Sequence, residues 1–152
     1  MNPMRRVSHL VRRWTSSLDR SPLDRSELDH VRSVLLDEEW RLWQRMTLAD
    51  RRHSIVVANR FVTLVPDATD AEVAAAYLHD VGKCITSMST TERVVATLIA
   101  PVHRPRRFAA YYEHESIGLD LCRAAGSRER TLALLSDPDD RLGEALRRAD
   151  DL

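Results

Sequence analysis

The sequence has few of the residues that mark fibrous or cross-linked proteins. It has only four glycines among 152 residues, together with 43% hydrophobic and 30% charged residues, a composition that disfavours collagen-like, fibrous and disordered classes. Its two cysteines, Cys84 and Cys122, form no Cys-x-x-Cys motif, so neither a thiolate metal site nor a disulfide framework is indicated. We expect both as buried, reduced thiols.

The chain also lacks a long apolar run and a net charge. No apolar stretch approaches the roughly 20 residues of a membrane helix, and the basic N-terminus lacks the apolar core of a signal peptide. The 23 basic and 23 acidic residues cancel, so no overall field draws the chain to nucleic acid or to an anionic membrane. We therefore expect a cytoplasmic protein without membrane insertion and without a strong nucleic-acid signal. The oligomeric state stays open.

Strand signals are absent, and helical spacing dominates. Neither alternating apolar and polar residues nor Asn-Gly and Asp-Gly hairpin turns occur, so the sequence predicts an all-α fold. We expect an N-terminal helical extension over residues 1–46, starting with an amphipathic helix near 4–18, packed on a domain over residues 47–152. Trp40 and Trp43 are interpreted as anchors that fasten the extension to the core.

Periodicity and capping residues divide the rest of the chain into helices. Over residues 50–65 an apolar stripe places His53 on the inward face. Thr69 and Glu72 form a capping box that opens the next helix, which is expected to run to Gly82. A further helix is predicted over 93–100, and the next one carries His114 and ends at Gly126. A short helix is predicted from Ser127 to Leu135, and a last helix follows Asp137 as its cap and Pro138 in its first turn.

Potential metal ligands lie on separate predicted helices. They are His53, the adjacent pair His79 and Asp80, and Asp150. Imidazole nitrogens and carboxylate oxygens suit divalent ions, and their convergence would make an open hydrolytic site. Both carboxylates fall in the last turn of an expected helix, where the helix dipole disfavours a negative charge by roughly 0.3–1 kcal/mol unless a cation is bound. Taken singly, each residue also fits a simpler role as a buried histidine or a solvated carboxylate.

The order of these residues resembles the HD superfamily of metal-dependent phosphohydrolases. The resemblance covers roughly residues 50–152 and rests on His53, the string His79-Asp80-Val81-Gly82-Lys83, His114 with Gly118, and Asp150. It implies an HD-domain helical bundle in which His53, His79, Asp80 and Asp150 bind one divalent metal ion. It also implies catalytic roles for Asp80, Lys83 and His114. Lys83 would contact a substrate phosphate, and His114 would contact either a phosphate or a second metal ion.

The activity implied by the resemblance is hydrolysis of a phosphomonoester or phosphodiester, with a nucleotide as one candidate, by metal-activated water. Arg104, Arg106 and Arg107 are candidate phosphate contacts, although exposed loop arginines more often serve solubility. The chain has no further histidine between His114 and Asp150, which favours one metal ion over two. Its identity among Mn, Fe, Zn, Mg and Ni stays open.

Two other functions fit the same residues. The first is a non-catalytic nucleotide-sensing or scaffolding module that keeps the metal for stability. The second is an HD-type di-iron oxygenase, which we favour less because a di-iron centre needs more ligands than the sequence offers.

Overall fold

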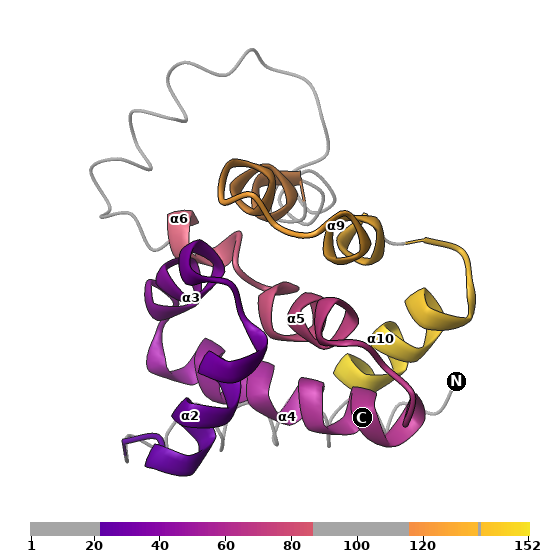
Figure 1. Ribbon diagram of the computed structural model, residues 1–152, viewed down its shortest axis with the longest axis horizontal. Coiled ribbons are helices and arrows are strands. Elements are labelled where there is room, and N and C mark those ends of the chain that lie inside the picture. Colours follow the sequence, from indigo (N-terminus) through magenta and orange to yellow (C-terminus); the bar gives the residue numbers. More distant parts are fainter. Residues whose placement is uncertain (1–21, 87–115, 137) are drawn as a thin grey trace, which may run out of the picture.

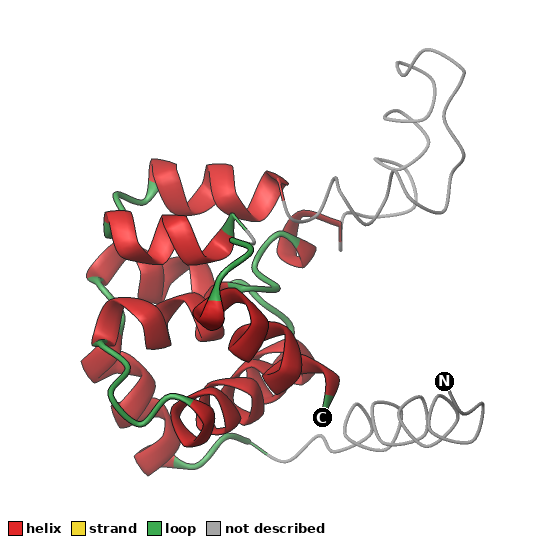
Figure 2. Ribbon diagram, turned by 90° about the vertical axis from the view of Figure 1, so that its right-hand side faces the viewer, coloured by secondary structure: helices red, strands yellow, loops and turns green. Residues whose placement is uncertain are grey.

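A computed structural model describes residues 22–86, 116–136 and 138–152 of the protein (Figure 1). Within these ranges every regular element is a helix and no strand occurs, which confirms the predicted all-α fold (Figure 2). The helices are α2 (Arg25–Val34), α3 (Asp37–Gln44), α4 (Leu48–Leu64), α5 (Asp70–Leu78), α6 (Lys83–Thr86), α9 (Glu129–Leu135) and α10 (Arg141–Asp151), and residues 116–124 are also helical. The helices predicted near 4–18 and over 93–100 lie outside the described residues.

The central helix of the fold is α5. It packs against α2, α3, α4 and α9, and Figure 1 shows it between α4 and α9. All eight residues over 71–78 are buried, and apart from Glu72 they are alanine or larger apolar and aromatic side chains on every side of the helix. Small alanine side chains let the surrounding helices approach closely, so the residues that follow α5 are held in the middle of the bundle.

The long helix α4 lies beside α5 and confirms the stripe predicted over residues 50–65. Val57 and Phe61 on this stripe are fully buried, and His53 lies on the same face. The helix begins after Thr47, whose hydroxyl accepts a hydrogen bond from the Asp50 amide at 3.1 Å. Helix α10 packs against α4, which brings the last described helix beside the first predicted metal ligand.

Helices α2 and α3 share one hydrophobic cluster with α4, α5 and α10. Trp43 is fully buried, stacks on Trp40 with ring centroids 5.2 Å apart, and donates a hydrogen bond from Nε1 to Ser54 Oγ at 2.9 Å. Trp43 is therefore an anchor for α3, whereas Trp40 is only partly buried. No helix in the described ranges combines the length and the apolar character needed to cross a membrane.

Two predicted helix boundaries are confirmed by their caps. Glu72 Oε2 accepts a hydrogen bond from the Thr69 amide at 2.8 Å, as the predicted capping box requires. Gly126 has a φ of 70° and ends the helix over 116–124. The Ser127 amide donates back to the Cys122 carbonyl and the Gly126 amide to the Arg123 carbonyl, both at 3.0 Å, which is a Schellman motif.

Three predicted boundaries are wrong. Helix α5 ends at Leu78 instead of Gly82, because tight turns over residues 79–82 replace the helical hydrogen bonds. Helix α9 has Arg128 at its N-cap position, not Ser127, and no side chain caps it. Helix α10 begins at Arg141 instead of Pro138, because the Asp140 carboxylate caps the amides of residues 142 and 143, both at 2.9 Å.

Candidate metal centre

Three of the four predicted ligands converge at one point of the bundle. One ligand atom each from His53, His79 and Asp80 can be chosen so that all lie within 4.8 Å of one another. Ligands that share one ion at about 2.1 Å lie no more than about 4.2 Å apart, so these atoms need only a slight contraction to hold a cation. The two imidazole rings are tilted by 59° with centroids 5.6 Å apart.

Asp150 joins the same cluster from α10. Its Oδ1 lies 2.7 Å from His53 Nε2 and 3.6 Å from His79 Nε2. The four residues thus come from three places: the second turn of α4, the turn after α5, and the last turn of α10. The packing of α4 against both α5 and α10 brings these places together.

A backbone hydrogen bond orients His79. Its Nδ1 lies 2.9 Å from the Ala76 carbonyl, and a proton on Nδ1 satisfies that contact and leaves the Nε2 lone pair facing the cluster. Nε2 is buried without a hydrogen-bond partner among the described residues, with Asp80 Oδ2 at 3.5 Å and Asp150 Oδ1 at 3.6 Å. A buried, unsatisfied nitrogen between two carboxylates is an environment that a divalent cation fits.

The charges of the cluster stabilise one another. Burial alone would lower the pKa of His79, but the Asp150 and Asp80 carboxylates outweigh it and raise this pKa. Burial alone would raise the pKa of Asp80, but His79 and Lys83 hold it below its usual range. In the same way, His53 and His79 overcome the effect of burial and lower the pKa of Asp150. Both carboxylates are therefore ionised at neutral pH, as metal ligands must be.

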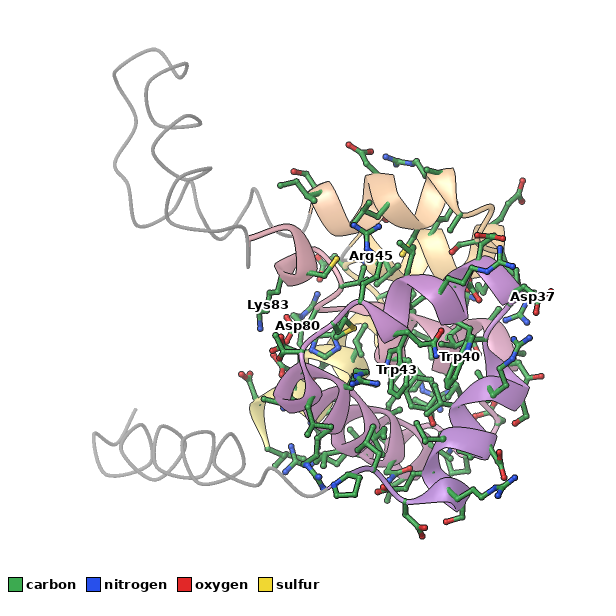
Figure 3. All side chains as sticks on the ribbon, turned by 90° about the vertical axis from the view of Figure 1, so that its left-hand side faces the viewer. Asp37, Trp40, Trp43, Arg45, Asp80 and Lys83 are labelled. Carbon is green, nitrogen blue, oxygen red and sulfur yellow. The ribbon has the colours of Figure 1, made fainter. Side chains whose placement is uncertain are left out.

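Lys83 stands at the edge of the cluster. Its Nζ lies 2.5 Å from Asp80 Oδ2, and Figure 3 shows the two side chains together at the start of α6. About a third of the Lys83 side chain is exposed, compared with 15% of Asp80. The lysine thus lies between the candidate ligands and solvent.

The turn that carries His79 and Asp80 packs against Gly118. A Cβ added at residue 118 would lie 3.2 Å from the Gly82 nitrogen, which is tighter than ordinary side-chain contact. This close approach explains why residue 118 is glycine, and it holds the helix over 116–124 against the turn that carries His79 and Asp80. His114 itself, and the candidate phosphate contacts Arg104, Arg106 and Arg107, lie outside the described residues.

Sequence reasoning missed two contacts that support the ligands. Arg60 Nη1 donates to the carbonyl of Ala149, the neighbour of Asp150, at 3.1 Å. Arg60 follows His53 by seven residues, or two helical turns, so its helical spacing was a usable signal. Trp43 bonds Ser54 beside His53, a contact between α3 and α4 that no spacing within one helix indicates.

Comparison of the chain with protein families, with curated proteins and with solved structures finds no match.

Proposed function

We propose that this chain is an HD-type metal-dependent phosphohydrolase. The observation that carries the proposal is the buried Nε2 of His79, which has no hydrogen-bond partner among the described residues and lies between the Asp80 and Asp150 carboxylates. Together with His53, these residues supply two nitrogen and two oxygen ligands for one divalent ion. The candidates for this ion are Mn, Fe, Zn, Mg and Ni. The order of the ligands along the chain is that of the HD superfamily.

The residues of the site have separate tasks in the proposed reaction. When bound, the metal ion would polarise a phosphoryl oxygen and lower the pKa of a coordinated water. Asp80 and Asp150 supply negative charge to hold the ion, and the Ala76 carbonyl keeps His79 in the tautomer that can bind it. Lys83, at the exposed edge beside Asp80, is placed to neutralise charge that develops on a phosphate.

The proposed substrate is a phosphomonoester or phosphodiester, with a nucleotide as one candidate. His114 is proposed to contact its phosphate, since the helix that follows packs through Gly118 against the turn bearing the ligands. Arg104, Arg106 and Arg107 are proposed as further phosphate contacts. We propose the cytoplasm as the location, in keeping with two free cysteines, Cys84 and Cys122.

One observation favours a second function, a non-catalytic nucleotide-sensing or scaffolding module. Each carboxylate of the cluster already has a cationic or hydrogen-bonding partner within the protein, Lys83 for Asp80 and His53 for Asp150. Such a cluster can persist as a structural element. The two functions differ in whether a bound phosphoester is cleaved.

The test is hydrolysis of a panel of nucleotides and simple phosphoesters by the full chain loaded with Mn²⁺, Fe²⁺ or Zn²⁺. Replacing Asp80 by asparagine keeps its shape and removes its charge, so Asp80→Asn should lower kcat by about 100-fold or more, by analogy with losses at single electrostatic groups in active sites. The matched control is Asp120→Asn, which removes an exposed carboxylate paired only with Arg123 among the described residues.

Cleavage that is lost in Asp80→Asn and kept in Asp120→Asn would support the phosphohydrolase. Stoichiometric metal binding without cleavage of any phosphoester would overturn it. Nucleotide-induced increases in the melting temperature, again without cleavage, would instead support the sensing module.

A further inference from the structure

Arg60 ties α4 to the end of α10. Its guanidinium donates a hydrogen bond from Nη1 to the Ala149 carbonyl at 3.1 Å, across 89 residues of sequence. Ala149 is fully buried and directly precedes Asp150, the proposed ligand on α10. The contact therefore acts on the backbone beside the ligand and not on its carboxylate.

The acceptor lies in the last turn of α10, which is described up to Asp151. A guanidinium beside a carbonyl of the last turn interacts favourably with the negative end of the helix dipole. Arg60 thus gives this turn a hydrogen bond from another helix.

The last turn of α10 needs such an attachment. Helix ends fray unless tertiary contacts hold them, and the residues on either side of the Ala149–Asp150 pair are exposed, with Leu152 at 58% exposure. Asp150 lies in this turn, and its side chain is 37% exposed, more than twice the exposure of His79 or Asp80. Of the proposed ligands, Asp150 is therefore the one whose position depends most on local order.

Helix α4 attaches this turn at two points. His53 Nε2 contacts Asp150 Oδ1 at 2.7 Å, and Arg60, two helical turns further along the same face, contacts the carbonyl of the preceding residue. Two contacts from one rigid helix to successive residues fix both the position and the rotation of the α10 end. Ala145, Leu146 and Ala149 of α10 also pack in the hydrophobic core, and these two contacts add polar attachments at the last turn.

We infer that Arg60 is a positioning residue that holds the end of α10 against α4, so that the Asp150 carboxylate stays aimed at the metal centre. The role of Arg60 in metal binding rests on the proposed metal centre. Its role in ordering the last turn of α10 does not depend on a metal ion.

The experiment compares Mn²⁺ affinity, measured by titration calorimetry on the full chain, among wild type, Arg60→Met and Arg148→Met. Loss of an outer contact to a ligand typically weakens metal binding by about 10–100-fold, and this range is expected for Arg60→Met. Arg148→Met is the matched control, since Arg148 is exposed in the same turn and makes no hydrogen bond or ion pair with the described residues. Its affinity should stay within about twofold of wild type, as expected for a surface change.

A double-mutant cycle separates positioning from general destabilisation. In an Asp150→Ala background, Arg60→Met should weaken Mn²⁺ binding no further, because the ligand that it positions is gone. Arg60→Lys, which keeps a donor and a positive charge, should recover part of the loss. An equal loss with and without Asp150, or no loss at all, would overturn the inference.

Hydrogen exchange of the metal-free protein distinguishes failure of this inference from failure of the proposed function. Amides over residues 146–151 should exchange faster in Arg60→Met than in wild type or Arg148→Met. If wild type binds no metal, the metal centre fails, and this exchange difference still decides the role of Arg60 at the end of α10. Unchanged exchange would show that Arg60 does not order the turn.

Discussion

The chemistry of the candidate site depends on the hydrogen bonding of the two ring nitrogens of His79. One ring nitrogen is bonded to the Ala76 carbonyl, within the helix that His79 follows, and the other is left to the cluster. The second nitrogen faces the Asp80 and Asp150 carboxylates at 3.5 and 3.6 Å, and the proposed metal ion would bind between them.

At the level of single residues, Ser54 is expected to contribute to stability because its hydroxyl accepts the hydrogen bond of a buried tryptophan. Ser54→Ala removes the acceptor of the buried Trp43 indole N–H and leaves that donor unsatisfied, which should lower the free energy of unfolding by about 1–3 kcal/mol. Ser33→Ala is the control, because exposed Ser33 also donates to a backbone carbonyl three residues earlier. It should change stability by less than about 0.5 kcal/mol. Urea denaturation measures both, and equal effects would contradict the role given to the Trp43 bond.

Among the elements, α5 is held at its start by a carboxylate that serves two helices. Glu72 Oε2 accepts from the Thr69 amide and Oε1 accepts from Arg130 Nε on α9, both at 2.8 Å. Thr131, also on α9, donates to the Ala71 carbonyl at 2.7 Å. The N-terminus of α5 is thereby fastened to α9, while its C-terminus delivers His79 to the candidate site.

The Glu72 contacts predict a pH-dependent stability. Burial alone would raise the pKa of Glu72, but the hydrogen bonds from Thr69 and Arg130 lower it below its ordinary value of 4.5. A lowered pKa means that the contribution to stability is complete above 4.5 and is lost as the pH falls through the folded-state pKa. Glu72→Gln should therefore lower the free energy of unfolding by about 1 kcal/mol at pH 7, and the difference from wild type should shrink on acidification.

Guanidinium denaturation of wild type and Glu72→Gln between neutral and acidic pH measures this difference. Glu144→Gln, an exposed glutamate in the first turn of α10, is the control and should show a smaller difference at every pH. A difference for Glu72→Gln that stays constant or grows as the pH falls would contradict the assigned role.

For the whole molecule, the sequence was sufficient to predict the structural features that depend on local residue patterns. The all-α class, the inward face of α4, the cap at Glu72 and the turn at Gly126 follow from periodicity and capping rules. The convergence of His53, His79 and Asp80 was expected from the family resemblance and is present in the structure.

What the sequence did not reveal depends on tertiary contacts or on competition between similar residues. Asp137, Asp139 and Asp140 are all suitable caps, and only the path of the chain into α10 selects Asp140. The end of α5 at Leu78 depends on tight turns that keep His79 and Asp80 at the site. The bond from Arg60 to the Ala149 carbonyl joins helices whose packing the sequence alone does not specify.

The most direct test of the central claim is the metal content of the purified full chain after incubation with Mn²⁺, Fe²⁺ or Zn²⁺ and removal of excess ion, beside the double variant His79→Ala/Asp80→Ala. A metal centre at these residues should retain close to one tightly held divalent ion per chain in wild type and almost none in the variant. Wild-type protein that retains no metal, or a variant that retains as much as wild type, would contradict a metal centre at these residues.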